Sequence, residues 1–151
     1  MNDQLWLEDY IRSSGAVAGT VHRYEERAGD EHGGLRLTAA HNIPPKVCEV
    51  VTWVPWGKGM AGQALITGQP ISTCNLKDDS SAAVRPGARA VDAQAAVALP
   101  VAAADGTIKA VVGVAWAQSR DLSSSELQHL SELAASVLAI SSVAGNAMVR
   151  S

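Results

Sequence analysis

The chain has 151 residues and a mass of 15.7 kDa, enough for one ordinary hydrophobic core and too few for the two halves of a full dinucleotide-binding enzyme. Hydrophobic residues make up 47% and charged residues 18%, a composition typical of a folded globule and not of a disordered chain. The formal net charge is −3 and the basic residues are scattered, so we expect no nucleic acid partner.

The first residues and the cysteines indicate the compartment. Asp3, Glu8 and Asp9 interrupt the apolar residues at the start, which excludes a signal peptide, and no later apolar run approaches a membrane span. Cys48 and Cys74 are the two cysteines, and they fit neither a zinc-ligand arrangement nor a C-x-x-C motif. Free thiols suit a reducing compartment, so we expect a cytoplasmic protein that does not bind membranes.

A helix and two strands are predicted for the N-terminal part. In residues 3–14, apolar side chains recur at intervals of three and four residues before Gly15, which is a helix stop. Residues 17–25 are rich in β-branched and aromatic side chains, and residues 34–41 alternate between polar and apolar after a polar, glycine-bearing link. We therefore expect an amphipathic helix followed by two antiparallel strands that an exposed loop joins.

The middle of the chain gives weaker signals. Residues 45–54 carry four valines at helical spacing, but their β-branched side chains suit a strand equally well, so both structures stay open. Residues 60–68 predict a short helix and residues 71–76 a short strand. Residues 77–87 are small and polar, which is typical of a mobile loop and makes them the segment best suited to close over a ligand.

A hairpin and a long helix are predicted for the C-terminal part. Residues 94–103 and 108–117 are apolar runs on either side of Asp105-Gly106, a strong hairpin signal, and we expect them to form the central antiparallel pair of the sheet. Ser123 or Ser124 is the expected N-cap of the long helix. The apolar stripe of that helix consists of Leu127, Leu130, Leu133, Ala134, Val137 and Leu138.

These elements predict a single α+β domain over residues 1–151 with an antiparallel sheet. It has an N-terminal helix at 3–14, a core at 17–118 and a C-terminal helix at 123–146. The stripe of the C-terminal helix is too broad for one contact with a sheet, and the N-terminal helix adds Leu5, Trp6 and Tyr10 nearby. We therefore expect a homodimer that forms through the terminal helices.

Gly57, Gly59 and Gly62 have the G-x-G-x-x-G spacing of a dinucleotide-binding loop, with the acidic pair 78–79 about twenty residues downstream. That motif needs a strand running into the first glycine and a long crossover helix to a parallel strand. Here the residue pair 55–56, a proline and a tryptophan, precedes the glycines, the helix is short, and a hairpin follows. The order of elements therefore argues against a dinucleotide site.

The same glycines open a short helix whose free N–H groups can face a pocket. Trp53, Trp56 and Met60 are available as apolar walls around it. Such a helix end suits an anion or a polar group of a ligand, so this stretch is the predicted pocket wall.

Three stretches, taken in order, resemble the GAF domain family: "VPWGKGMAGQALITGQPISTCNL", "AAVALPVAAADGTIKAVVGVAWA" and "DLSSSELQHLSELAASV". The likeness runs from about Gly19 to the C-terminal helix and rests on the whole set, because each stretch alone is weak. It implies a GAF-like (PAS/profilin-like) fold with a six-stranded antiparallel sheet. The terminal helices, which commonly dimerise in the family, lie on one face, and a ligand pocket lies on the other beneath the short helices.

The resemblance implies a sensory or regulatory module that binds a small molecule and is not an enzyme. A stand-alone member acts through a separate partner such as a sensor kinase, as the family's nitrate receptors do. Neither the ligand nor a cofactor can be named from the sequence. The alternative is a free methionine-(R)-sulfoxide reductase, but that subfamily is expected to have cysteines at positions 51–52 and 60–61, where this chain has none.

The predicted ligand-binding residues are Trp53, Trp56, Gly59, Met60, Ala61, Arg85, Arg89, Val97 and Trp116. Arg85 and Arg89 lie in the loop beside the expected pocket, where a guanidinium clamps an anion or is simply solvated. For Trp116, plain core packing is an equally good interpretation. The four histidines, at positions 22, 32, 41 and 129, have no spacing that converges on a metal, and no catalytic residue is predicted.

Overall fold

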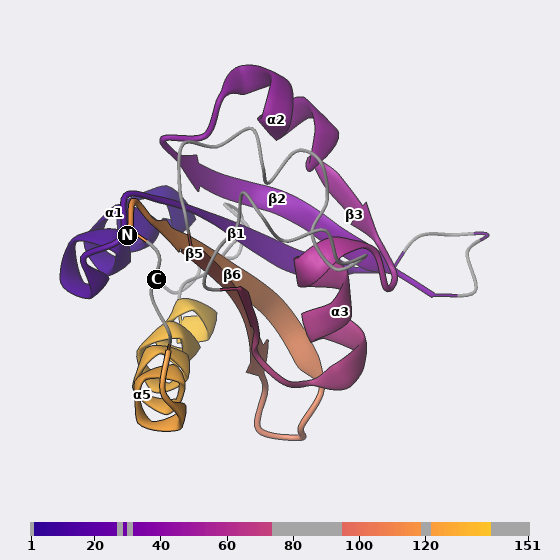
Figure 1. Cartoon of the computed structure of the whole chain (residues 1–151). Coiled ribbons are helices and arrows are strands. Elements are labelled where there is room, and N and C mark those ends of the chain that lie inside the picture. Colours follow the sequence, from indigo (N-terminus) through magenta and orange to yellow (C-terminus); the bar gives the residue numbers. More distant parts are fainter. Residues whose placement is uncertain (1, 27–28, 30–31, 74–94, 119–121, 140–151) are drawn as a thin grey trace.

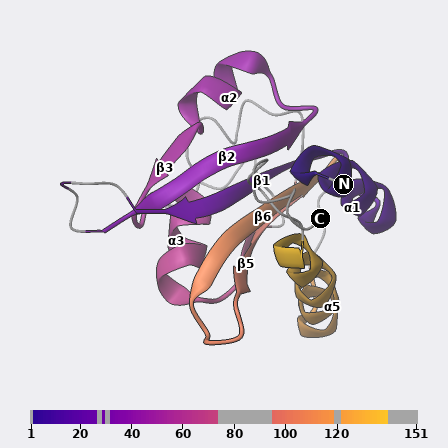
Figure 2. The same ribbon diagram turned by 180° about the vertical axis from the view of Figure 1, so that it is seen from behind.

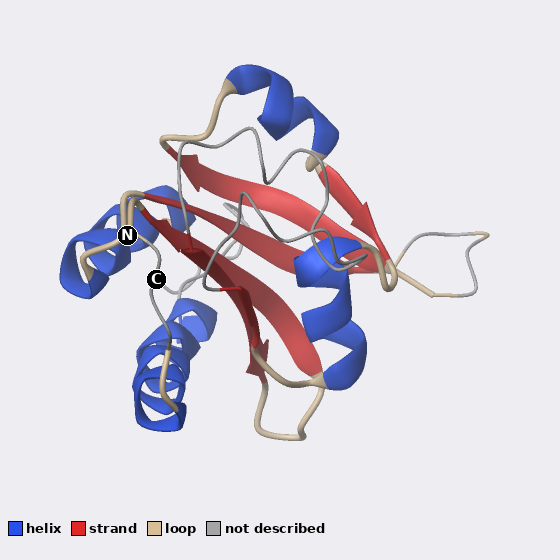
Figure 3. Ribbon diagram, viewed as in Figure 1, coloured by secondary structure: helices blue, strands red, loops and turns tan. Residues whose placement is uncertain are grey.

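An antiparallel sheet with helices on both faces makes up the structure, a computed structural model that describes residues 2–26, 29, 32–73, 95–118 and 122–139 (Figures 1 and 3). The elements are α1 (Asp3–Ser14), β1 (Ala18–Glu25), β2 (Gly34–His41), α2 (Pro45–Val50), β3 (Trp53–Pro55), α3 (Gly59–Thr67), β4 (Ile71–Thr73), β5 (Ala95–Ala102), β6 (Ile108–Trp116), α5 (Ser124–Ala134) and the 3₁₀ helix η1 (Ala135–Ala139). The open choice for residues 45–54 is resolved as a short helix followed by an edge strand.

The strand order is β3-β2-β1-β6-β5-β4, and each pair of neighbouring strands is antiparallel. The predicted hairpin is present, with Gly106 at φ +87° and the Asp105 carboxylate accepting a hydrogen bond from the Thr107 N–H at 2.9 Å. The expectation that β5 and β6 form the central pair is wrong, because β6 also pairs with β1 and the centre of the sheet is β1·β6.

The two shortest strands lie at opposite edges of the sheet, and this determines where α3 goes. β3 pairs with β2 at one edge and β4 pairs with β5 at the other. The connection between β3 and β4 must therefore cross one face of the sheet, and α3 packs over the β5–β6 side of that face (Figure 1). The terminal helices α1 and α5 lie on the opposite face, as the view from behind shows (Figure 2).

Local signals explain the bounds of the terminal helices. The Asn2 side chain accepts a hydrogen bond from the Leu5 N–H, and Gly15 ends α1 in the left-handed conformation. Ser123 and Glu126 form a capping box at the start of α5. No helix among the described residues is both long and apolar enough to cross a membrane.

The α-helix predicted at 123–146 ends earlier than expected. It changes to 3₁₀ geometry at Ala135, and residues 140–146 lie outside the described part of the chain. The tighter turn presents Ser136 to α1, where its Oγ accepts a hydrogen bond from Trp6 Nε1 at 2.8 Å. Packing against α1 therefore accompanies the end of the regular helix.

Large side chains fill the core between the sheet and the terminal helices. Trp6 and Tyr10 stack at 4.9 Å between ring centroids, and the Tyr10 hydroxyl donates to the Leu130 carbonyl at 2.8 Å. Burial raises the pKa of Tyr10. Trp6 and Tyr10 are thus buried in the core of the chain. Their expected place on a dimer surface is therefore corrected. Leu5 and Leu133 remain 52% and 39% exposed.

A buried ion pair ties four elements together on this face. Arg23 of β1 donates to both carboxylate oxygens of Asp3 in α1, at 2.9 and 2.7 Å, and to the Val137 carbonyl of η1 at 3.0 Å. Thr38 of β2 donates to Asp3 Oδ2 at 2.6 Å. Burial alone would raise the pKa of Asp3, but the hydrogen bonds from Arg23 and Thr38 and the charge of Arg23 outweigh it and lower the pKa.

Candidate functional site

The face of the sheet opposite the terminal helices is hollow at its centre. Along each strand, successive side chains point to opposite faces, and here the positions facing α2 and α3 carry almost no side chain. The pairing brings these positions into two rows across β1, β6 and β5. The rows are Ala18–Ala115–Ala96 and Thr20–Gly113–Ala98. We call these six residues the floor.

Gly113 at the centre of the floor has a specific steric role. A Cβ at this position would lie 3.0 Å from Thr20 Oγ1, closer than an ordinary van der Waals contact. Glycine therefore keeps the floor open and leaves room for the Thr20 hydroxyl. The next row begins with His22 and Val111, whose larger side chains are both buried and close the hollow at that end.

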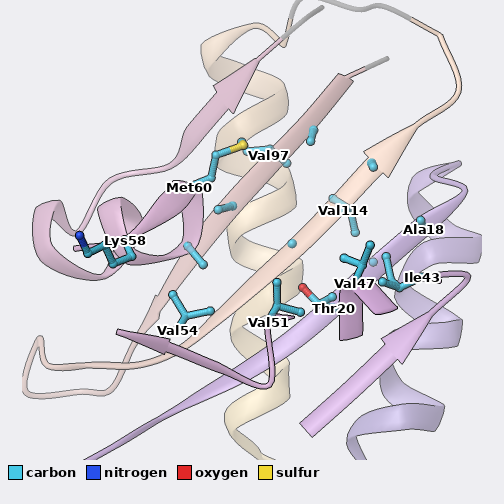
Figure 4. A pocket seen from close by; sticks show the side chains of 16 residues that line it. Ala18, Thr20, Ile43, Val47, Val51, Val54, Lys58, Met60, Val97 and Val114 are labelled. Atoms are coloured by element: carbon cyan, nitrogen blue, oxygen red, sulfur yellow. The ribbon is translucent and has the colours of Figure 1, made fainter. Parts of the chain in front are cut away.

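Walls from the segment between β2 and the first turn of α3 turn the hollow into a cavity of about 150 Å³ (Figure 4). They comprise Ile43, Val47, Val51, Val54, Lys58, Met60 and Ala61. Among the described residues that line the cavity, Thr20 and Lys58 are the ones with polar side chains. The Thr20 hydroxyl faces the cavity, whereas the Lys58 nitrogen is at the end turned away from the other lining side chains (Figure 4).

His22 holds one wall of the cavity in place. Its side chain is buried, and Nε2 lies 2.8 Å from the Val51 carbonyl oxygen, so that nitrogen carries the donated proton. Because His22 belongs to β1 and Val51 follows α2, the contact fixes the wall to the central strand. This histidine therefore has a structural partner and not the solvated role that an isolated histidine usually has.

A family model for the GAF domain matches residues 6–140. The chain belongs to the GAF domain family. The expected six-stranded α+β GAF fold is confirmed, with helices on both faces of the sheet. A comparison with curated proteins found no significant match for this GAF domain.

Solved structures share the fold at low sequence identity. A type II free methionine-R-sulfoxide reductase from Thermoplasma acidophilum is 15% identical with a TM-score of 0.67, over 89% of this chain and 88% of that one. The GAF domain of a phosphoenolpyruvate-protein phosphotransferase from Acinetobacter is 17% identical with a TM-score of 0.68, over 90% and 79%. NreA from Staphylococcus aureus, mutated in its nitrate-binding site, is 15% identical with a TM-score of 0.63, over 83% and 96%.

Three of the nine predicted site residues line the cavity of this GAF domain: Met60, Ala61 and Val97. Val97 is on the opposite phase of β5 from the floor, and its side chain packs in the helix-side core. Its carbonyl oxygen lies 3.8 Å from where a Cβ of Gly113 would be, so Val97 contributes backbone to the cavity.

The three predicted tryptophans are not among the residues that line this cavity. Trp116 is 2% exposed in the helix-side core, since it shares the phase of β6 that faces α1. Trp53 packs beside Arg36, whose guanidinium carbon lies 5.7 Å from the ring centroid. Trp56 is 38% exposed and stacks on His32 at 4.4 Å. In each case another surface of the fold uses the aromatic ring.

Glycines of the G-x-G-x-x-G stretch serve the backbone and not the cavity. Gly59 begins α3 at φ +66°, a conformation that other residues adopt only with strain, and it is not among the residues lining the cavity. A Cβ on Gly62 would lie 2.7 Å from the Gly57 carbonyl carbon, so Gly62 lets α3 close against its own turn. The predicted Arg85 and Arg89 fall outside the described residues.

Among the described residues, neither a cysteine nor a cluster of metal-ligating side chains lines this cavity. Cys48 is half-buried, its thiol lies 3.7 Å from the Ile43 carbonyl oxygen, and it does not line the cavity. Cys74 lies outside the described residues. In the part of the chain that the structure describes, no three histidine, cysteine or acidic side chains come together as a metal site.

Sequence reasoning missed the floor of the cavity. It searched for large or charged groups, whereas the cavity exists because small residues occupy one phase of three adjacent strands. The available signal was the alternation in residues 108–117, where valines and a tryptophan fill one phase and a glycine and an alanine fall on the other. The register of the hairpin then aligns Ala96 and Ala98 with that second phase.

Proposed function

We propose that this GAF domain is a regulatory module that binds a small molecule and passes the binding on to a signalling protein. The observation that carries the proposal is the cavity of about 150 Å³ between the sheet and the crossing segment. The cavity is concave and its described lining is almost wholly apolar with few polar groups, which is the usual form of a small-molecule site. A cavity with a well-defined floor and walls is therefore best explained by an occupant.

β1 supplies a physical route from this cavity to the terminal helices. Thr20 faces the cavity, and Arg23, three residues further along the same strand, holds Asp3 of α1 and the Val137 carbonyl of η1 on the other face. A ligand that shifts β1 changes the geometry at both places. The terminal helices are accordingly the proposed output surface.

A homodimer through α1 and α5 is part of this proposal. Leu5 and Leu133 are large apolar side chains that the chain itself leaves exposed on these helices. We expect light scattering to give the dimer mass and the Leu5→Glu/Leu133→Glu variant to give the monomer mass. A wild-type mass that stays monomeric at every concentration would contradict the dimer.

Native mass spectrometry of freshly purified protein tests the binding function directly. We expect a small-molecule mass that leaves on denaturation and is lost in Ala115→Val, because two added methyl groups occupy the floor. Ala102→Val makes the same change at an exposed position of β5 and should retain the molecule. A clean apoprotein mass, with no metabolite from a cell extract retained after dialysis, would count against a binding function.

The alternative, a methionine sulfoxide reductase, predicts a different result. That reaction needs a thiolate that reaches the substrate, and Cys48 is not among the residues lining the cavity. We expect no turnover of free methionine-(R)-sulfoxide with a thiol reductant. Turnover that Cys48→Ser or Cys74→Ser abolishes would favour the enzyme over the regulatory module.

A further inference from the structure

The cavity also limits the chemistry of its ligand. We propose that it takes a small, uncharged, largely apolar molecule about the size of one six-membered ring, with a single polar group directed at Thr20. This inference rests on the proposed function, since it names the class of ligand for the same cavity. Its support comes from the size, the charge and the one polar group of the site.

Size comes first. The cavity has a volume of about 150 Å³. An engineered protein cavity of about this volume with apolar walls binds benzene. A nucleotide or a tetrapyrrole is several times larger, so most of it would lie beyond the described walls, on the open side of the cavity.

Charge is the second constraint. Thirteen of the sixteen described lining residues are glycine, alanine, valine or isoleucine, and Lys58 directs its nitrogen away from the cavity (Figure 4). The nearby guanidinium of Arg23 lies on the other face of the sheet, where Asp3 neutralises it. An anion placed on the floor would lose its hydration without gaining an ion pair from these residues, which is strongly unfavourable.

Thr20 gives the ligand its direction. No other described residue is hydrogen-bonded to its hydroxyl, which faces the cavity (Figure 4). A hydroxyl both donates and accepts, so it matches an alcohol, a phenol or a carbonyl on the ligand. Because the other floor residues are alanine or glycine, a planar ring can lie against the sheet within reach of this group.

Four probes of similar or smaller size test the inference by isothermal titration calorimetry: benzyl alcohol, toluene, benzoate and nitrate. We expect benzyl alcohol to bind best, toluene to bind more weakly, and benzoate to bind at least about tenfold more weakly than benzyl alcohol. Ala115→Val should weaken binding of both neutral probes about tenfold, while Ala102→Val leaves it unchanged. Melting temperatures confirm that each variant is folded.

Thr20→Val provides a test that does not depend on filling the floor. It keeps the shape of the side chain and removes the hydroxyl, so benzyl alcohol should lose about three- to tenfold in affinity and toluene nothing. Equal losses of affinity for both probes would show that the hydroxyl does not direct the ligand. If Ala115→Val left the affinity of the neutral probes unchanged, they would bind outside this cavity. Either result overturns the inference.

Binding of the charged probes distinguishes failure of this inference from failure of the proposed function on which it rests. Benzoate or nitrate could bind as tightly as benzyl alcohol and lose that affinity in Ala115→Val. This result would overturn the uncharged class of ligand and leave the binding function standing. If no probe binds while a molecule co-purifies, the inference alone fails. If neither occurs, both fail.

Discussion

The two faces of the sheet use the same strands in opposite ways. In β6, Val112, Val114 and Trp116 face the terminal helices and are buried, while Gly113 and Ala115 face α3 and leave space. On the face toward the terminal helices, the Arg23–Asp3 ion pair and the stacked rings of Trp6 and Tyr10 add to this packing. The face toward α3 instead has a cavity of about 150 Å³.

On the proposed function, this difference assigns stability to one face and binding to the other. Burial of large apolar side chains is the dominant favourable term in folding, and most of it lies between the sheet and the terminal helices. The floor contributes little, because alanine and glycine have little side-chain surface to bury. Substitutions on the two faces should therefore have different effects on the free energy of unfolding. The following experiments test that contrast from the largest effect to the smallest.

Arg23→Met should have the largest effect. It leaves the Asp3 carboxylate buried without its cation and should lower the free energy of unfolding by about 3–5 kcal/mol in chemical denaturation at neutral pH. The double variant Asp3→Leu/Arg23→Met removes both charges and should recover most of the loss. A single-variant loss below about 1 kcal/mol would mean that the pair behaves like one at the surface.

Ala→Val substitutions at two positions of β6 compare the faces directly. Ala110 is fully buried on the helix side, so Ala110→Val should overpack the core and cost about 1–3 kcal/mol of unfolding free energy. Ala115→Val points its methyl groups into the cavity and should change stability by no more than about 0.5 kcal/mol. Equal costs at the two positions would mean that the cavity is not available space.

Removal of a hydroxyl gives a smaller contrast. Tyr10→Phe loses the hydrogen bond to the Leu130 carbonyl, which is buried, and should cost about 1 kcal/mol. Thr20→Val on the other face breaks no hydrogen bond among the described residues and should cost less in the same denaturation experiment. A greater loss for Thr20→Val would show that its hydroxyl is already engaged in the fold.

The last effect is a change of stability with pH that appears only in acid. Because the folded pKa of Asp3 lies below its ordinary value of 3.8, its ionisation stabilises the fold above that value. This contribution is lost as the pH falls from 3.8 through the lowered pKa. Unfolding free energy measured across that window should fall less steeply for Asp3→Asn than for the wild type, and parallel slopes would contradict the assignment.

Much of the fold was predictable because its local signals are strong. Asp105-Gly106 between two apolar runs predicts the hairpin, and Ser123 with Glu126 predicts the start of α5, which are interactions within a few residues. The position of β5 relative to the centre was not predictable in this way, because it depends on β6 pairing with β1, far away in the sequence. The end of α5 likewise depends on contacts with Trp6.

The site was less predictable for a different reason. Aromatic residues and glycine motifs are the usual signs of a pocket, but Trp116 packs in the core and Gly62 lets α3 approach the turn before it. A cavity defined by missing side chains becomes visible only when the strand register is known. Met60 and Ala61 were found because they lie on the segment that the chain order places over the sheet.

The floor has a consequence for how such a protein can diversify. Ala96, Ala98 and Ala115 can each gain a methyl group independently, since none of them belongs to the helix-side core. After gene duplication, single substitutions at Ala96, Ala98 or Ala115 would change the shape that the cavity accepts without a compensating second mutation. On the proposed function, ligand preference can therefore change through single substitutions, whereas loss of one partner of the Asp3–Arg23 pair costs stability.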